Sequence, residues 1–550
     1  MARRRRDDQE PEPEVETAST AGASYLEVLR TAGHGGAAER LATEQARGLL
    51  GDVDRARISW RVSRLASDAA MLAEAAEEIE QAGALAFPHS SLQRDLPRRV
   101  AQHDLAEPSQ VRVGLATHEP RNPTRYRGRA FALDTDVLRT SLLVVGPPGS
   151  GKTRSFALPI LEHLCLQSLA GQASVLVVDP KGDDFAAPDM FDVDIDLANP
   201  ASSWGLDLYG GAETPDEAAD RLASALIPPG TTADKAYFVD ASKNALYQAL
   251  APFHAAHGRR YPTIPELLGV LGGDDSALQS LRDRLRHKGL LRHYERQLEA
   301  RERQRRRRDD PAASLLERLG LLDRPSLVRL FDQTTRRFAM RQINQPTRVR
   351  VSLPEAQYPE ASVILARLVV SQFVQVVSAP TTNKDIFKGL LVDEAGRYVD
   401  DYVARGVQRV RANNAGLILL TQSLGDLPEE LRQPIFGSVG CKAVFAGLDP
   451  GDARYMADWW GTRWVGDLTL SARHGESHSV TPGILSLRGW FPRRDTYSQS
   501  EQQGVSLRRV ERDLWSPSEI INDVPPGHAL ISLARSDGTR TPPILVNLRT

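Results

Sequence analysis

A glycine-rich segment carries the first residues of this sequence whose types and spacing could do chemistry. It matches the pattern G-x-x-x-x-G-K-[ST] and consists of Gly146, Pro147, Pro148, Gly149, Ser150, Gly151, Lys152 and Thr153. The apolar run 141–145 predicts a buried strand that ends at this loop, and residues 154–169 predict a helix directly after it. Glycines in this setting let backbone N–H groups close around phosphates at a helix N-terminus. We therefore predict that the loop binds ATP, with Lys152 neutralising the β- and γ-phosphates and the Thr153 hydroxyl ligating Mg²⁺.

Two adjacent acids follow a second apolar run. Residues 389–392 predict a strand, and Asp393 and Glu394 come directly after it. Open α/β sheets bind ligands at the carboxyl ends of their strands, so acids at this point are suited to a metal–nucleotide site. We predict that Asp393 holds Mg²⁺, directly or through water, and that Glu394 polarises the attacking water.

A third polar residue ends a predicted strand beside the one that bears the acids. Residues 416–420 predict that strand, and Gln422 follows it. We predict that Gln422 senses the γ-phosphate or orients the attacking water. We expect the glycine-rich loop and the acid pair to meet at adjacent strand ends and to enclose one magnesium-bound triphosphate. The sequence therefore predicts a hydrolase of nucleoside triphosphates, with ATP as substrate and Mg²⁺ as cofactor.

The elements that would position these residues alternate between strand and helix. Further strands are predicted at residues 111–115, 129–133, 175–178, 348–352, 443–446, 528–533 and 544–548. The run 175–178 is apolar without alternation, which is typical of a strand buried on both faces of a parallel sheet. A helical block separates the two groups of strands. We predict an α/β core with a parallel-rich sheet, an inserted all-α domain and a small helical N-terminal region.

The same patterns suggest how the chain is divided. We expect a disordered tail at residues 1–22, where charged residues and proline predominate, and a helical region with its connection at 23–109. The core would then comprise residues 110–211, which carry the glycine-rich loop, and 341–550, which carry the acids and the glutamine. The all-α insertion would span residues 212–340.

Composition narrows the class of protein. The formal net charge is −2, so any contact with nucleic acid must come from a local patch or a lined channel. The two cysteines form neither a disulfide framework nor a zinc pattern, which suits a reducing cytosol. The apolar stretch 361–379 is interrupted by polar residues, and we interpret it as a mostly buried helix. The N-terminal residues lack the apolar core of a signal peptide.

Four motifs in order carry a family resemblance. They are GPPGSGKT, DPKGD at residues 179–183, LLVDEAG and LILLTQS. Together they resemble the FtsK–HerA superfamily of ring-shaped DNA-pumping ATPases and, more narrowly, the type IV coupling proteins of conjugation and type IV secretion. The resemblance covers about residues 110–550 and implies a RecA-like P-loop NTPase fold. It also implies a DNA translocase that works as a homo-hexamer and delivers DNA or DNA–protein substrates to a conjugation or type IV secretion channel, with a relaxase or secretion-channel proteins as partners.

The resemblance implies one more catalytic residue. In the family, an arginine eleven positions before the glutamine acts on the γ-phosphate bound by the neighbouring subunit. Here that position is Arg411. An arginine supplied by a neighbour would stabilise transition-state charge and make hydrolysis depend on assembly.

The sequence also departs from the family and leaves alternatives open. Family members usually begin with transmembrane helices, and none is predicted here, so we expect a cytoplasmic protein, peripheral at the inner face of the membrane and bound to it only through a partner. The alternatives are a protein-handling secretion ATPase that delivers effectors without DNA, and a nucleotide-gated assembly adaptor with negligible hydrolysis. The basic run 282–308 would contact phosphates or an acidic partner, or would form a solvated helix and loop.

Overall fold

The computed structural model describes residues 24–227, 233–308, 310–333, 335–482, 485–486, 489–490 and 494–549. The predicted tail at residues 1–22 lies outside them. Within the described residues, the largest sheet has 12 strands in the order β1-β2-β18-β17-β12-β4-β11-β10-β5-β9-β6, with β3 paired to β2. The predicted α/β class with a parallel-rich sheet is therefore confirmed.

Seven neighbouring strands of this sheet are parallel and form its centre. In spatial order they are β12 (Cys441–Phe445), β4 (Leu142–Val145), β11 (Ala415–Thr421), β10 (Phe387–Val392), β5 (Ala173–Asp179), β9 (Arg348–Ser352) and β6 (Val193–Asp196). Beyond β12 the strands are antiparallel to their neighbours: β17 (His528–Ser532), β18 (Ile544–Asn547), β2 (Gln110–Ala116), β3 (Ala130–Asp134) and β1 (Gln102–Asp104). All ten strands predicted from the sequence are present in this sheet. The edge strands β1 and β6 were not predicted, and both are short.

One expectation about the site was wrong in detail. The phosphate-binding loop follows β4 and the acids follow β10, but these strands are not neighbours, because β11 pairs with both. The order of strands in space is set by how helices cross over the sheet, and local sequence patterns carry no information about it. The carboxyl ends of β4, β11 and β10 still lie at the same edge, since the three strands are parallel.

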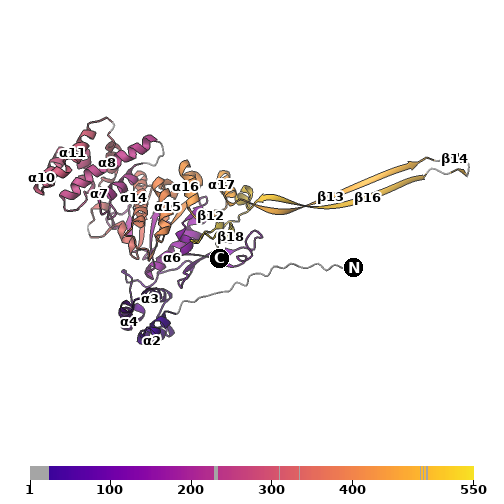
Figure 1. Cartoon of the computed structure of the whole chain (residues 1–550), viewed down its shortest axis with the longest axis horizontal. Coiled ribbons are helices and arrows are strands. Elements are labelled where there is room, and N and C mark those ends of the chain that lie inside the picture. The colour runs from indigo at the N-terminus through magenta and orange to yellow at the C-terminus, as the bar shows by residue number, and fades with distance from the viewer. Residues whose placement is uncertain are drawn as a thin grey trace.

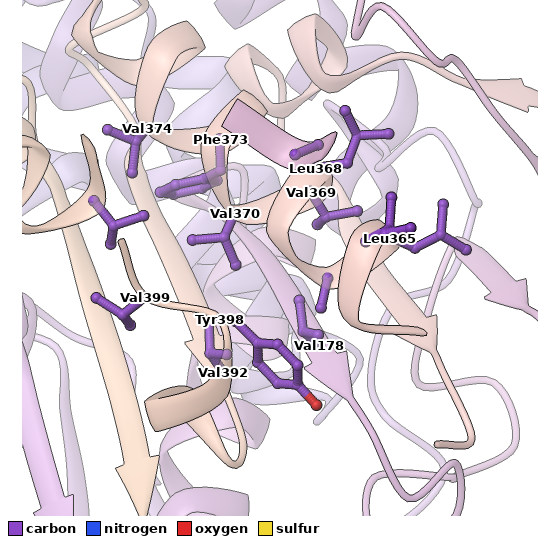
Figure 2. Close-up of a cluster of buried hydrophobic side chains, with 14 of the residues drawn as sticks. Val178, Leu365, Leu368, Val369, Val370, Phe373, Val374, Val392, Tyr398 and Val399 are labelled. Carbon is purple, nitrogen blue, oxygen red and sulfur yellow. The ribbon is translucent and has the colours of Figure 1, made fainter. Parts of the chain in front are cut away.

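Helices cover both faces of the central sheet, because alternate strand residues point to opposite sides. On one face α6 (Leu158–Leu169) packs in a cluster with Leu142, Val144, Val177 and Leu391. On the other face α14 (Pro359–Ser378) packs on Val178 and Val392, as Figure 2 shows. The α/β core also contains α15 (Asp401–Ala412), α16 (Glu429–Ser438), α17 (Pro450–Trp460) and the short helices α5 (Thr135–Arg139) and α18 (Pro517–Asn522).

Helix α14 is the apolar stretch that the sequence predicts to be buried. By length and composition it resembles a membrane-spanning helix, yet 83% of its most apolar window is buried inside the protein. Its Arg367 is nearly covered and donates to the carbonyls of Ser224 and Ile227. Its burial makes α14 a core helix of this fold.

The remaining helices form two groups at the periphery. Between β6 and β9 the chain forms α7 (Pro215–Leu226), α8 (Ala233–Ala256), α9 (Ile264–Gly272), α10 (Asp275–His287), α11 (Leu291–Arg305), α12 (Ala312–Leu322) and α13 (Arg329–Asp332), and this group lies at one end of the molecule (Figure 1). At the N-terminal end, α1 (Tyr25–Thr31), α2 (Gly35–Ala46), α3 (Asp52–Leu65) and α4 (Ala69–Ala82) share a separate apolar cluster.

A long two-stranded ribbon was not predicted from the sequence. It consists of β13 (Thr462–Thr481) and β16 (Arg494–Asp513), and it extends away from the body at the end opposite to the peripheral helices α7–α13 (Figure 1). Its strands are rich in Ser, Gln, Arg and His, so they lack the apolar runs that identify buried strands.

A buried histidine pair next to α6 gives the fold a testable pH dependence. His163 Nδ1 lies 3.2 Å from His103 Nδ1, and His163 Nε2 lies 3.2 Å from Ser109 Oγ. His103 in turn contacts Glu162. Burial lowers the pKa of His163 to about 3, and the His103 ring acts in the same direction.

Acid should therefore destabilise the protein through His163. The folded state holds this ring neutral, so its contribution to stability is complete above the unfolded pKa and is lost as pH falls toward the folded pKa. Between pH 7 and pH 5 we expect a loss of about 2 kcal/mol from this group. Thermal unfolding of the wild type and of His163→Gln across this range measures it, and parallel profiles for the two proteins would contradict the assignment.

Candidate nucleotide-binding site

The phosphate-binding loop takes its shape from two glycines at positions that disfavour other residues. Gly151 has φ 97°, a left-handed conformation that disfavours other residues, and it precedes the helical turn that begins at Lys152. A Cβ at Gly146 would lie 2.7 Å from Cβ of Phe445 on the neighbouring strand β12. The chain then continues as a π-helical turn, Lys152–Ala157, and as α6. The helix thus starts at the loop itself, two residues earlier than predicted.

Lys152 is folded back onto its own loop. Its ammonium donates to the carbonyl oxygen of Gly146 over 3.1 Å, and only 5% of the residue is exposed. Burial lowers the pKa of Lys152, while the nearby carboxylates of Glu394 and Asp393 act in the opposite direction. The strands β4, β11 and β10 are parallel and adjacent in that order, so the loop and the acid pair, distant in the sequence, lie at the same edge of the sheet. Thr153, which follows Lys152 in the sequence, is half-buried.

The environment of Asp393 is suited to a carboxylate that binds a cation. It is fully buried, and its Oδ1 accepts a hydrogen bond from the backbone of Glu394 over 3.0 Å. Its Oδ2 is also buried and makes no hydrogen bond. Burial raises the pKa of Asp393 to about 6, and Lys181 acts in the opposite direction. A buried oxygen without a hydrogen bond is costly unless a ligand satisfies it, so this side chain fits a metal ligand.

The acid set also fits Mg²⁺ in particular. Across the described ranges, no three His, Cys, Asp or Glu side chains gather closely enough to hold a metal by themselves. Mg²⁺ is usually bound through one or two carboxylates together with substrate phosphates and water. Asp393 Oδ2, which makes no hydrogen bond and has Lys181 Nζ 3.5 Å away, offers one carboxylate oxygen of this kind at the strand edge that carries the phosphate-binding loop.

Glu394 and Gln422 form a hydrogen-bonded pair across two neighbouring strands. Gln422 Nε2 donates to Glu394 Oε1 over 2.8 Å. Glu394 has a left-handed backbone, φ 50° and ψ 39°, which turns the chain sharply after β10. Both side chains are half-buried, so they remain accessible from the site. The pair can hold a carboxylate in a fixed orientation next to the phosphate-binding loop.

Sequence reasoning missed Lys181, although it noted the segment DPKGD. Lys181 Nζ lies 2.8 Å from Asp184 Oδ2, 3.5 Å from Asp393 Oδ2 and 3.7 Å from Glu394 Oε1. Burial alone would lower the pKa of Lys181, but the hydrogen bond with Asp184 and the charges of Asp393 and Glu394 raise it. Its position directly after β5, which pairs with the acid-bearing strand, was the available signal.

Arg350 holds the segment that carries Lys181. From β9 its guanidinium reaches Asp179 at 3.2 Å and donates to the carbonyl of Gly182. A third contact, with Asp194 of β6, is 3.2 Å long. Arg350 is nearly buried, so this network is a fixed support for the turn after β5.

Arg411 lies away from the other predicted site residues of its own chain. It is exposed near the end of α15, just before β11 begins at Ala415, whereas Gln422 follows the other end of β11. The seven residues of β11 span roughly 23 Å. Arg411 donates instead to the backbone carbonyl of Ser536. With this separation, the Arg411 side chain does not reach the nucleotide site of the same chain.

The basic run 282–308 contains both arginines that make contacts within the protein and arginines that are exposed. Arg301 is buried, and it binds Asp310 and the carbonyl of Leu271. Arg282 pairs with Glu302 at 2.7 Å, and Arg305 donates to the carbonyl of Gly273. These contacts anchor part of the run in the helical packing, whereas Arg292, Arg296 and residues 306–308 are exposed, as a solvated helix and loop would be.

Comparisons with known proteins find similarity in structure. No family model matches the sequence, and no curated protein matches it. The unbound monoclinic form of the bacterial conjugative coupling protein TrwBdeltaN70 superposes with a TM-score of 0.53 at 18% identity, over 76% of this chain and 87% of that chain. The TrwB complexes with the analogues ADPNP and GDPNP both have a TM-score of 0.50 at 18% identity, and they cover 75% and 83% of this chain, and 86% and 97% of theirs.

At this level of identity the likeness concerns the fold. The resemblance to coupling proteins that the motifs suggest is confirmed in that sense, and so is the predicted RecA-like P-loop architecture with an all-α domain.

Proposed function

We propose that this chain is an Mg²⁺-dependent ATPase motor of the type IV coupling-protein class, which moves DNA or a DNA–protein substrate toward a conjugation or type IV secretion channel. The observation that carries the proposal is the Glu394–Gln422 hydrogen bond, which lies at the same edge of the sheet as the phosphate-binding loop. A loop that only bound phosphate would need neither an oriented glutamate nor its glutamine partner. The fold shared with TrwB, whose solved complexes contain ADPNP and GDPNP, supports the nucleotide as substrate.

Each side chain of the nucleotide-binding site has a separate role in the proposed hydrolysis. The backbone of the loop Gly146–Thr153 surrounds the phosphates, and Lys152 exchanges its bond with the Gly146 carbonyl for the β- and γ-phosphates. Thr153 and Asp393 would hold Mg²⁺, which neutralises phosphate charge when bound. Glu394 accepts a proton from the attacking water, and Gln422 keeps its carboxylate oriented.

Assembly of several copies would bring an arginine to each nucleotide-binding site. Arg411 cannot reach its own site, so we propose that it stabilises transition-state charge in the site of an adjacent copy, as in a homo-hexameric ring. Turnover would then require subunit contact, and each hydrolysis event would be coupled to a change at the interface between two copies.

Two alternatives differ from this proposal in measurable ways. A protein-handling secretion ATPase would turn over ATP without any response to DNA. A nucleotide-gated assembly adaptor would bind ATP and scarcely hydrolyse it, and the paired Glu394 and Gln422 count against it. Contacts with a relaxase or with channel proteins, and attachment to the inner face of the membrane through a partner, belong to the same proposal.

The decisive experiment measures the ATPase rate with and without single- and double-stranded DNA across a range of protein concentration. We expect the rate per subunit to rise with concentration and to increase about tenfold or more when DNA is present, because DNA would engage the assembled form. Concentration-dependent turnover without a DNA response would favour the protein-handling alternative. A rate that responds to neither variable would contradict both the motor and the ring.

A further inference from the structure

Lys181, in the segment DPKGD, makes contacts in the nucleotide-binding site to which the proposed hydrolysis gives no role. Its ammonium lies 3.5 Å from Asp393 Oδ2, 3.7 Å from Glu394 Oε1 and 2.8 Å from Asp184 Oδ2. Lys152, the lysine of the phosphate-binding loop, donates instead to a carbonyl of its own loop. Lys181 therefore brings a positive charge to both acids of the site.

The backbone on either side of Lys181 is held in place, whereas its side chain is not. β5 pairs in parallel with β10, so the turn after β5 lies beside the acids that follow β10. Arg350 contacts Asp179 and donates to the carbonyl of Gly182, which flank this turn. The Lys181 side chain is 46% exposed, so the ammonium can leave the acids while the backbone of the turn stays where it is.

Asp393 Oδ2 is the oxygen for which Lys181 and a metal ion would compete. The other oxygen, Oδ1, accepts a hydrogen bond from the backbone of Glu394. Oδ2 is buried and makes no hydrogen bond, and Lys181 lies within ion-pair distance of it. Two cations at one buried carboxylate oxygen repel each other strongly, because burial weakens the screening of their charges. A metal ion that binds Asp393 must therefore displace the ammonium of Lys181.

A nucleotide would change the balance of this competition. A metal ion that arrives alone takes the carboxylate from Lys181 and brings no other anion for its ammonium. A metal ion that arrives with a triphosphate also brings phosphate oxygens, and lysine is a common phosphate ligand. The same phosphates supply part of the coordination of Mg²⁺, which is usually bound by one or two carboxylates together with substrate phosphates.

We propose that Lys181 is a positioning residue that competes with Mg²⁺ for Asp393, so that the site binds the metal together with the nucleotide in preference to the metal alone. The inference deepens the proposed function, because it rests on Asp393 as the metal ligand of an ATPase. It concerns the regulation of that site, namely the order in which metal and nucleotide enter it.

Binding of Mn²⁺ without any nucleotide tests the competition directly. Mn²⁺ replaces Mg²⁺ as the probe because both prefer carboxylate oxygens, and electron paramagnetic resonance measures the free ion in solutions of the full chain. Lys181→Met removes the charge and keeps most of the length of the side chain. We expect the Kd for Mn²⁺ to be about tenfold or more lower in this variant than in the wild type. Equal values for the two proteins would overturn the inference.

Two control variants show whether the charge at this position is the cause. Lys243→Met makes the same replacement at a lysine that pairs with Asp220 at 3.2 Å on the peripheral helices, and its Kd for Mn²⁺ should stay within about twofold of the wild type. Lys181→Arg keeps the positive charge and should stay within about threefold. A gain in Mn²⁺ affinity in Lys181→Arg as large as that in Lys181→Met would contradict competition by charge.

A double variant locates the ion that the Lys181→Met protein gains. Asp393→Asn removes the carboxylate for which Lys181 and the metal compete, so its combination with Lys181→Met should abolish the gain in Mn²⁺ affinity. If the gain persisted in the double variant, the ion would be bound elsewhere, and competition at Asp393 would be refuted.

Nucleotide binding separates failure of the inference from failure of the proposed function. Titration of the wild type with a fluorescent ATP analogue and Mg²⁺ reports on the proposed function, and absence of binding would refute it. The Mn²⁺ measurements use no nucleotide, so their outcome does not depend on that result. If the wild type bound and hydrolysed ATP while Lys181→Met bound Mn²⁺ no more tightly than the wild type, the inference alone would fail.

Discussion

Glu394→Gln is expected to lower kcat for ATP hydrolysis by about a thousandfold while nucleotide binding stays within about threefold of the wild type. The substitution removes the group that accepts the proton from water but keeps the size of the side chain. It also preserves a hydrogen-bonding partner for Gln422, whose Nε2 lies 2.8 Å from Glu394 Oε1. Single-turnover hydrolysis and titration with a fluorescent ATP analogue measure the two quantities separately.

Glu355→Gln provides the matched control for this variant. Glu355 accepts hydrogen bonds from Tyr398 and Arg397, just after the acid pair, so the same chemical change is made in the same neighbourhood. We expect its turnover to remain within a few-fold of the wild type, because Glu355 takes no part in the proposed chemistry. If both variants lost activity equally, the loss would reflect a disturbed loop, and Glu394 could not be assigned as the base.

Arg411→Ala should lower ATP turnover by about a thousandfold or more, with nucleotide binding spared. The reason is geometric: Arg411 is at the far end of β11 from Gln422, so it is absent from its own site and is required in that of a neighbour. Arg409→Ala, two positions earlier on the same helix, is the control and should keep most of the activity. Loss of nucleotide binding by Arg411→Ala would argue against the role.

Mixing the two inactive variants tests action between subunits directly. In mixed assemblies, an Arg411→Ala subunit retains Glu394 and receives Arg411 from a Glu394→Gln neighbour. With equal amounts, about a quarter of the interfaces would combine the two intact groups, so turnover should reappear on mixing. Failure to recover any activity, when sedimentation shows that mixed assemblies form, would exclude Arg411 as a group that acts on an adjacent copy.

The largest differences between the expected and the observed structure concern relations between distant segments. The sequence predicts the strand before Asp393 and the strand before Gln422, but it contains nothing that places β11 between β4 and β10. Lys181 was passed over for the same reason. Its segment stood out as a motif, yet its approach to Asp393 and Glu394 depends on the pairing of β5 with β10. The ribbon escaped prediction because its polar composition resembles that of a loop.

The sequence by itself determined the elements whose signals are local. The glycines and Lys152 of the phosphate-binding loop lie between an apolar strand and a helix, and each buried parallel strand is a short continuous apolar run. These features depend on backbone conformation and burial within a few residues, so they can be recognised without the rest of the chain. Only the tertiary structure decided which groups meet. It buried Asp393 with one oxygen lacking a hydrogen bond, joined Gln422 to Glu394, and placed Arg411 beyond the reach of its own site. Those outcomes follow from strand order and helix packing, which are properties of the whole chain.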